Sequence, residues 1–124
     1  MDPHVILLLS TDPFVERLAR EAVPATRHGL RVVQSSQEAF RQLKEGCEDV
    51  DLAIIDLDPG MHANALLEAA GDRLPVLVLT SLEENYMQPI AARHGALACL
   101  AKPFTAERLA EVIAQVLKQP PAAA

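Results

Sequence analysis

Five short aliphatic runs recur along the chain, at residues 4–9, 30–34, 52–57, 76–80 and 96–101. They are nearly continuous in Val, Leu, Ile and Ala, which is typical of strands buried on both faces. The segments between and after them repeat apolar residues three and four positions apart, as amphipathic helices do. Strand–helix alternation repeated five times predicts an α/β fold, a (βα)5 doubly wound parallel sheet in three layers with helices on both faces.

Several helix starts are indicated by residues that cap backbone N–H groups. Asp12, followed by a proline, predicts the cap of a first helix. Residues 35–38, Ser-Ser-Gln-Glu, have the pattern of a capping box, in which the first and last side chains bond to each other's backbone N–H. A third helix is expected at residues 63–70, and Thr105 predicts the cap of the last one.

The fourth helical segment, residues 83–94, contains Pro89, which removes a backbone donor and clashes with the preceding turn. We therefore expect this helix either to begin late, near Gln88, or to be kinked, and to end at Gly95. The proline also makes this helix a plausible mobile element. Glu83-Glu84 is interpreted as a solvated helix start.

Length and composition fit one domain at residues 1–118, followed at residues 119–124 by a tail or the start of a Pro/Ala linker. Half of the 124 residues are hydrophobic, and the net charge of −6 disfavours direct binding to nucleic acid or to an anionic membrane. The apolar start is too short for a membrane span and has no basic segment before it, so we expect a cytoplasmic protein. Cys47 and Cys99 fit no metal or redox spacing.

Polar side chains stand where the predicted strands end. Residues 10–12, Ser-Thr-Asp, follow the first strand, Asp56 ends the third, Thr80 ends the fourth and Lys102 follows the fifth. In an open parallel sheet, function gathers beyond the carboxyl ends of the strands. A carboxylate, a hydroxyl and an ammonium are therefore expected at one rim of the sheet.

The stretches "VILLLSTDP", "DLAIIDL", "PVLVLTS" and "GALACLAKPF" resemble the receiver domain of two-component response regulators, and the resemblance covers almost the whole chain. It implies a flavodoxin-like strand order of 2-1-3-4-5. It also implies that Asp56 accepts a phosphoryl group from a histidine kinase or a phosphotransfer protein, while Thr80 and Lys102 contact that group. Such a domain is a signalling switch rather than an enzyme. Its output domain or partner protein would bind through the fourth helix, fifth strand and fifth helix, and the resemblance also allows a homodimer.

The sequence departs from this family where the metal is expected. The family's first strand typically ends in two adjacent acidic residues that hold Mg²⁺, and these positions are Ser10 and Thr11 here. The best remaining metal set is Asp12 with Asp56, assisted by Asp58 chiefly through its carbonyl, although Asp12 is favoured as a helix cap. Each lost carboxylate removes an attraction of about 4 kcal/mol at an effective dielectric of about 20. We therefore expect Mg²⁺ binding to be weakened or absent.

Two functional interpretations follow from the resemblance. The chain is either an atypical receiver phosphorylated on Asp56, or a pseudo-receiver that binds a partner without phosphorylation. The output aromatic that often occupies the fifth strand is also replaced, by Cys99. A remote alternative is a flavodoxin-like cofactor binder. It is disfavoured because the loop after the first strand contains no glycine and the chain has only four aromatic residues.

Overall fold

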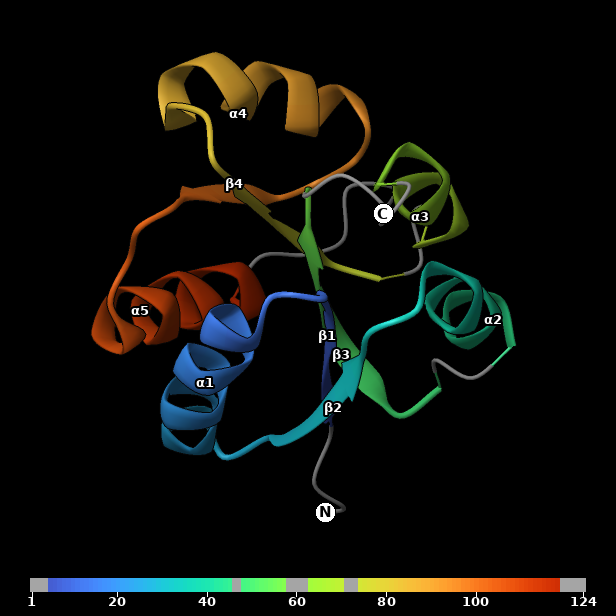
Figure 1. The fold of residues 1–124 in the computed structure, drawn as a ribbon, viewed down its shortest axis with the longest axis horizontal. Coiled ribbons are helices and arrows are strands. Elements are labelled where there is room, and N and C mark those ends of the chain that lie inside the picture. Colours follow the sequence, from blue (N-terminus) through green and yellow to red (C-terminus); the bar gives the residue numbers. More distant parts are fainter. Residues whose placement is uncertain (1–4, 46–47, 58–62, 71–73, 119–124) are drawn as a thin grey trace.

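A computed structural model of the chain describes residues 5–45, 48–57, 63–70 and 74–118. It contains a five-stranded sheet in the order β2-β1-β3-β4-β5, and all pairs of neighbouring strands are parallel (Figure 1). The predicted α/β class, parallel sheet and strand order are confirmed. The strands are β1 (Val5–Leu9), β2 (Gly29–Val33), β3 (Val50–Asp56), β4 (Val76–Thr80) and β5 (Ala98–Ala101).

The sheet is covered on both faces, which confirms the three-layer architecture. The helices are α1 (Pro13–Ala22), a short 3-10 helix η1 (Val23–Thr26), α2 (Ser36–Glu45), α3 (Ala63–Ala70), α4 (Glu84–Arg93) and α5 (Ala106–Leu117). Helices α1 and α5 lie on one side of the sheet, and α2, α3 and α4 lie on the other (Figure 1). Their apolar side chains form two separate cores, one on each face of the sheet. The neighbouring β3 residues Ile54 and Ile55 belong to these two opposite cores and are both fully buried. This explains the continuous apolar pattern of the central strands.

The predicted caps of three helices are present. Asp12 Oδ1 accepts a 2.9 Å hydrogen bond from the N–H of Phe14, and Thr105 Oγ1 accepts one of 3.0 Å from the N–H of Arg108. Ser35 Oγ accepts from the N–H of Glu38 at 3.2 Å, the first half of the capping box. Each bond satisfies one of the backbone donors that a helix start leaves unpaired.

The second half of the capping box, a hydrogen bond from the N–H of Ser35 to the Glu38 carboxylate, does not form between these two described residues. The carboxylate of Glu38 accepts hydrogen bonds from Arg41 and Gln42 one turn later in α2. The bonds to the guanidinium hold the pKa of Glu38 below its usual value, and the same contact raises the pKa of Arg41. A charged partner on the helix surface thus competes successfully with the neutral N–H of Ser35.

Of the two alternatives predicted for α4, a late start near Gln88 or a kink, the late start is wrong, because the helix begins at Glu84 and contains Pro89 in its interior. Its end at Gly95 agrees with prediction. Gly95 has a positive φ of 92°, and the N–H groups of Gly95 and Ala96 donate to the carbonyls of Ala92 and Ala91, both at 3.0 Å. This is a Schellman motif, which needs the left-handed backbone that glycine adopts without strain. Because Ala96 belongs to this motif, β5 begins later than predicted.

Two predictions fall outside the described residues. These are the tail at residues 119–124 and the third candidate metal ligand, Asp58. Among the helices that the structure describes, none is both long and apolar enough to cross a bilayer.

Candidate functional site

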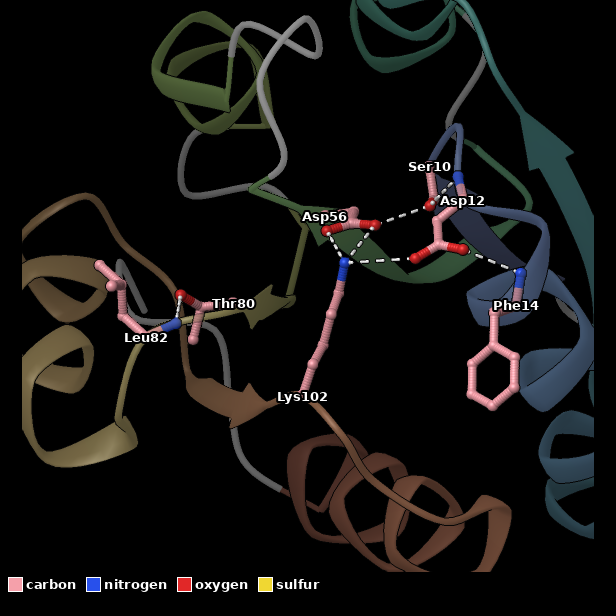
Figure 2. A network of polar contacts seen from close by, with 7 residues as sticks. All are labelled: Ser10, Asp12, Phe14, Asp56, Thr80, Leu82 and Lys102. Carbon is pink, nitrogen blue, oxygen red and sulfur yellow. Dashed lines mark hydrogen bonds and ion pairs between the residues drawn. The ribbon is translucent and has the colours of Figure 1, made fainter.

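Four chain segments bring polar residues to one rim of the sheet. Ser10 follows β1, Asp56 ends β3, Thr80 ends β4 and Lys102 follows β5. Because all strands are parallel, their carboxyl ends lie at the same edge, and Figure 2 shows Lys102 reaching from β5 across to β3 and β1. The predicted gathering of an acid, a hydroxyl and an ammonium at this edge is observed.

Asp56 and Lys102 form the centre of the site. The ammonium Nζ of Lys102 lies 2.8 Å from Oδ1 and 3.0 Å from Oδ2 of Asp56, so it contacts both carboxylate oxygens (Figure 2). Asp56 is 0% exposed, whereas the Lys102 side chain keeps 17% of its surface accessible. A buried carboxylate is costly unless a cation and hydrogen-bond donors compensate it. The ammonium explains why a core strand ends in a charged residue.

Ser10 is a second donor to the same carboxylate. Its hydroxyl donates a 2.7 Å hydrogen bond to Asp56 Oδ2, and its oxygen accepts from the N–H of Asp12 at 3.0 Å. The backbone N–H of Ser10 donates to the carbonyl of Val33 in β2, which fixes the residue against the sheet. The sequence pattern indicated only that Ser10 replaces an acidic residue, and its bond to Asp56 was not predicted.

Asp12 is the partly exposed carboxylate of the site. Its Oδ1 caps α1 by accepting from Phe14, and its Oδ2 is 3.7 Å from Lys102 Nζ (Figure 2). A third of its side chain is exposed. The preferred interpretation of Asp12 as a helix cap is confirmed, and the same side chain adds a second negative charge beside Lys102.

Thr80 belongs to the same rim but its hydroxyl is engaged on the side of α4. Thr80 is 3% exposed, and its Oγ1 accepts a 3.0 Å hydrogen bond from the N–H of Leu82 (Figure 2). Its carbonyl accepts a 2.8 Å bond from the N–H of Lys102, so the two backbones are tied together. The hydroxyl therefore lies at the junction between the rim and the start of α4.

The described part of the rim offers carboxylate oxygens to a divalent cation. Mg²⁺ prefers oxygen ligands in octahedral geometry, and carboxylates supply the charge. Among the residues that the structure describes, Asp12 and Asp56 are the carboxylates brought together here, and the Lys102 ammonium lies beside both. Within the described ranges, no cluster of three or more His, Cys, Asp or Glu side chains has a metal-binding arrangement. The positive charge facing Asp56 is that of the protein's own lysine.

Cys99 lies behind the rim, in β5 on the face covered by α4. It is buried, and this burial raises the pKa of its thiol, with a further contribution from the negative charge of Glu84. The thiol therefore packs as a small, largely apolar group in the core.

Comparison with known proteins agrees with this architecture. Residues 6–114 match the family described as the response regulator receiver domain. The two-component response regulator ARR10 of Arabidopsis thaliana is 26% identical over 117 residues, which are 92% of this chain and 21% of that protein. The chain thus spans about a fifth of this curated relative.

Solved structures show the same fold. A CheY-like response regulator receiver domain protein from Methanospirillum hungatei JF-1 is 20% identical, with a TM-score of 0.79 over 94% of this chain and 95% of the other. A response regulator from Thermotoga maritima is 18% identical, with a TM-score of 0.81 over 95% of this chain and 100% of the other. Since the family match covers nearly the entire described domain, the chain belongs to the response regulator receiver domain family of two-component signalling.

Proposed function

We propose that Asp56 is the residue at which this receiver domain accepts a phosphoryl group, from a histidine kinase or a phosphotransfer protein. Receiver domains are signalling modules that interact with such proteins and with output domains, and they are generally not enzymes in their own right. The observation that carries the proposal is the contact of the Lys102 ammonium with both oxygens of Asp56, at 2.8 and 3.0 Å, at the carboxyl end of the central strand β3.

The chemistry is a displacement at phosphorus. A carboxylate oxygen of Asp56 forms a bond to phosphorus while the bond between phosphorus and the donor's leaving group breaks, which yields an acyl phosphate. Repulsion between the carboxylate and the incoming phosphoryl group opposes this attack. The ammonium of Lys102 offsets that repulsion, because it already lies within hydrogen-bond distance of the carboxylate.

Ser10 and Thr80 would contact the phosphoryl oxygens after transfer. The Ser10 hydroxyl donates to Asp56 and can re-aim toward an added phosphoryl group from the same side. The Thr80 hydroxyl, which accepts from the N–H of Leu82, would turn toward the rim and release that contact. Loss of this hydrogen bond would free the backbone at Leu82, two residues before the first residue of α4, and would allow the start of the helix to shift. The output surface in this proposal consists of α4, β5 and α5, it can bind an output domain or partner protein, and it also allows a homodimer.

Receiver domains typically bind Mg²⁺ at an acidic pocket. We expect weakened Mg²⁺ affinity here, because Ser10 and Thr11 supply hydroxyls where the family has acids and the Lys102 ammonium lies between Asp12 and Asp56. The remaining parts of the proposal are a domain at residues 1–118, a linker at residues 119–124 and a cytoplasmic location.

A second candidate function is that of a pseudo-receiver, which binds a partner without phosphorylation. The observation in its favour is that Asp56 is completely buried and already paired within the protein. Asp56 is 0% exposed, and its Oδ2 already accepts hydrogen bonds from the Ser10 hydroxyl and the Lys102 ammonium, so the buried charge is compensated without a phosphoryl group. In this case the rim would serve to stabilise the fold and present α4 in one position.

Incubation with acetyl phosphate, with and without millimolar Mg²⁺, distinguishes these functions by intact mass. The phosphoacceptor proposal predicts a mass gain of one phosphoryl group that is lost in Asp56→Asn and strongly reduced in Lys102→Met. The matched control is Asp51→Asn, which alters a half-buried aspartate at the opposite end of β3. Beryllofluoride, which mimics the phosphoryl group, should shift NMR signals of residues 80–84 only in proteins that retain Asp56. Absence of both responses at any Mg²⁺ concentration contradicts the phosphoacceptor and supports the pseudo-receiver.

A further inference from the structure

An acidic side chain from α4 accepts a hydrogen bond from a backbone N–H at the outer edge of the sheet. β5 is an edge strand, and the N–H of Lys102 points inward to the carbonyl of Thr80 at 2.8 Å. Since successive N–H groups of a strand point to opposite sides, the N–H of Ala101 points away from β4. Glu84 Oε2 accepts this hydrogen bond at 3.1 Å. A backbone donor that the sheet leaves unpaired is thus satisfied from the first residue of α4.

The two adjacent glutamates at the start of α4 differ in what they contact. Glu83 is the N-cap residue, is exposed and makes no side-chain capping hydrogen bond. Glu84 is half-buried and reaches across to β5. Its charge also contributes to the raised thiol pKa of Cys99, two residues before Ala101, which agrees with a carboxylate that lies against this strand. The sequence interpretation of both glutamates as a solvated helix start is therefore correct for Glu83 only.

The contact lies directly beside the lysine of the site. Ala101 immediately precedes Lys102, whose ammonium contacts Asp56. The segment from Thr80 to Glu84 is joined to this part of the chain at two points, through the Thr80 carbonyl and the Glu84 carboxylate. A displacement of the first turn of α4 consequently acts on the N–H of Ala101, one residue before Lys102, whose own N–H is held by the end of β4.

We propose that Glu84 is a positioning residue for Lys102, coupling the start of α4 to the ammonium at Asp56 by holding the N–H of Ala101. The hydrogen bond makes the first turn of α4 and the end of β5 a single unit. A shift of Lys102 is transmitted to α4 through this bond, and a partner that displaces α4 alters the placement of Lys102 through the same bond. The effect of phosphorylation on this coupling rests on the proposed function, but the coupling itself does not.

The test compares Glu84→Ala and Glu84→Gln with Glu83→Ala, which removes the same charge one residue earlier. NMR measures amide hydrogen exchange at Ala101 and the ¹⁵N signal of the Lys102 ammonium. In Glu84→Ala the Ala101 amide should exchange about tenfold faster, as expected for loss of a hydrogen bond to a charged acceptor. The Lys102 ammonium signal should shift at the same time. Glu84→Gln should retain both properties, because its amide oxygen can accept the bond, and Glu83→Ala should leave both unchanged.

Three results would overturn the inference. The first is unchanged Ala101 exchange in Glu84→Ala, and the second is an equal effect of Glu83→Ala. The third is faster Ala101 exchange with an unmoved Lys102 signal, which would make Glu84 a purely structural contact.

Labelling by acetyl phosphate separates this result from the proposed function. If wild-type protein is not labelled, the phosphoacceptor proposal fails, whereas the NMR comparison still decides the role of Glu84. If it is labelled, the labelling rate should change in Glu84→Ala and not in Glu83→Ala.

Discussion

The hydroxyl of Ser10 donates a 2.7 Å hydrogen bond to Oδ2 of Asp56, which lies 46 residues later in the chain. The same hydroxyl oxygen accepts from the N–H of Asp12, which directs its proton toward the carboxylate. Ser10 is 2% exposed and Asp56 is 0% exposed. A position where the family typically has an acid thus supplies a neutral donor, and it compensates the buried charge of Asp56 instead of adding to it.

Replacement of Ser10 by alanine is expected to lower the free energy of unfolding by about 1.5–3 kcal/mol, the usual contribution of a hydrogen bond to a charged group. Urea denaturation measures this difference. The control is Thr11→Ala at the exposed neighbouring position, which should change stability by less than about 0.5 kcal/mol. Equal midpoints for the two variants would show that the Ser10 hydroxyl does not stabilise Asp56.

The strands and the rim were predictable because they depend on local pattern and on topology. Continuous apolar runs identified each strand to within two residues, and parallel pairing alone requires that Asp56, Thr80 and Lys102 end at one edge. The caps at Asp12 and Thr105 were predictable for the same reason, since each acts within its own turn.

The contacts of Ser10 and Glu84 could not be predicted in this way. Each joins two elements that are distant in sequence, and its existence depends on a side-chain rotamer and on the exact packing distance between those elements. The late start, one of the two alternatives predicted for α4, was wrong for a related reason. A proline disfavours a helix interior locally, but packing of Met87 and Ala91 in the core stabilises the helix around it.

Replacement of Lys102 by methionine is expected to cost about 3–5 kcal/mol of stability, because it deprives a buried carboxylate of its ammonium contact. In the Lys102→Met background, adding Asp56→Asn should restore part of that loss, since the buried charge is then removed as well. Denaturation of both single variants and the double variant gives the coupling energy, expected to exceed about 1 kcal/mol. Lys118→Met, at an exposed helix end, controls for the loss of a positive charge. Additive effects of the two site substitutions would contradict a direct interaction.

Cys99 should react slowly with alkylating reagents, because burial, together with the charge of Glu84, raises the pKa of its thiol. In a Cys47→Ala background, which leaves one thiol, the pH profile of alkylation should have a midpoint above the value of about 8.5 for an exposed cysteine. The same shift affects stability. The contribution of the buried neutral thiol is fully present below about pH 8.5 and is lost as pH rises through the folded-state pKa.

Stability measured at neutral and at alkaline pH tests this linkage. The decrease in unfolding free energy between the two conditions should be smaller in Cys99→Ala than in its Cys47→Ala parent, because no thiol then ionises. A midpoint for alkylation at or below that of an exposed cysteine would show that Cys99 is not held in the apolar environment described for it.

Pro89 lies in the interior of α4 and has no backbone N–H, so it cannot donate the usual intrahelical hydrogen bond to the carbonyl of Asn85. Replacement of Pro89 by alanine restores that backbone N–H and should stabilise the protein, by up to about 3 kcal/mol. Amide hydrogen exchange in the wild type should be faster in α4 than in α5, which contains no proline, and the substitution should reduce the difference. Gln88→Ala, at the adjacent exposed position, is the control and should change neither property. If α4 is already as well protected as α5, or if Pro89→Ala is destabilising, then the proline is compatible with a rigid helix, and the hypothesis of a mobile α4 is wrong.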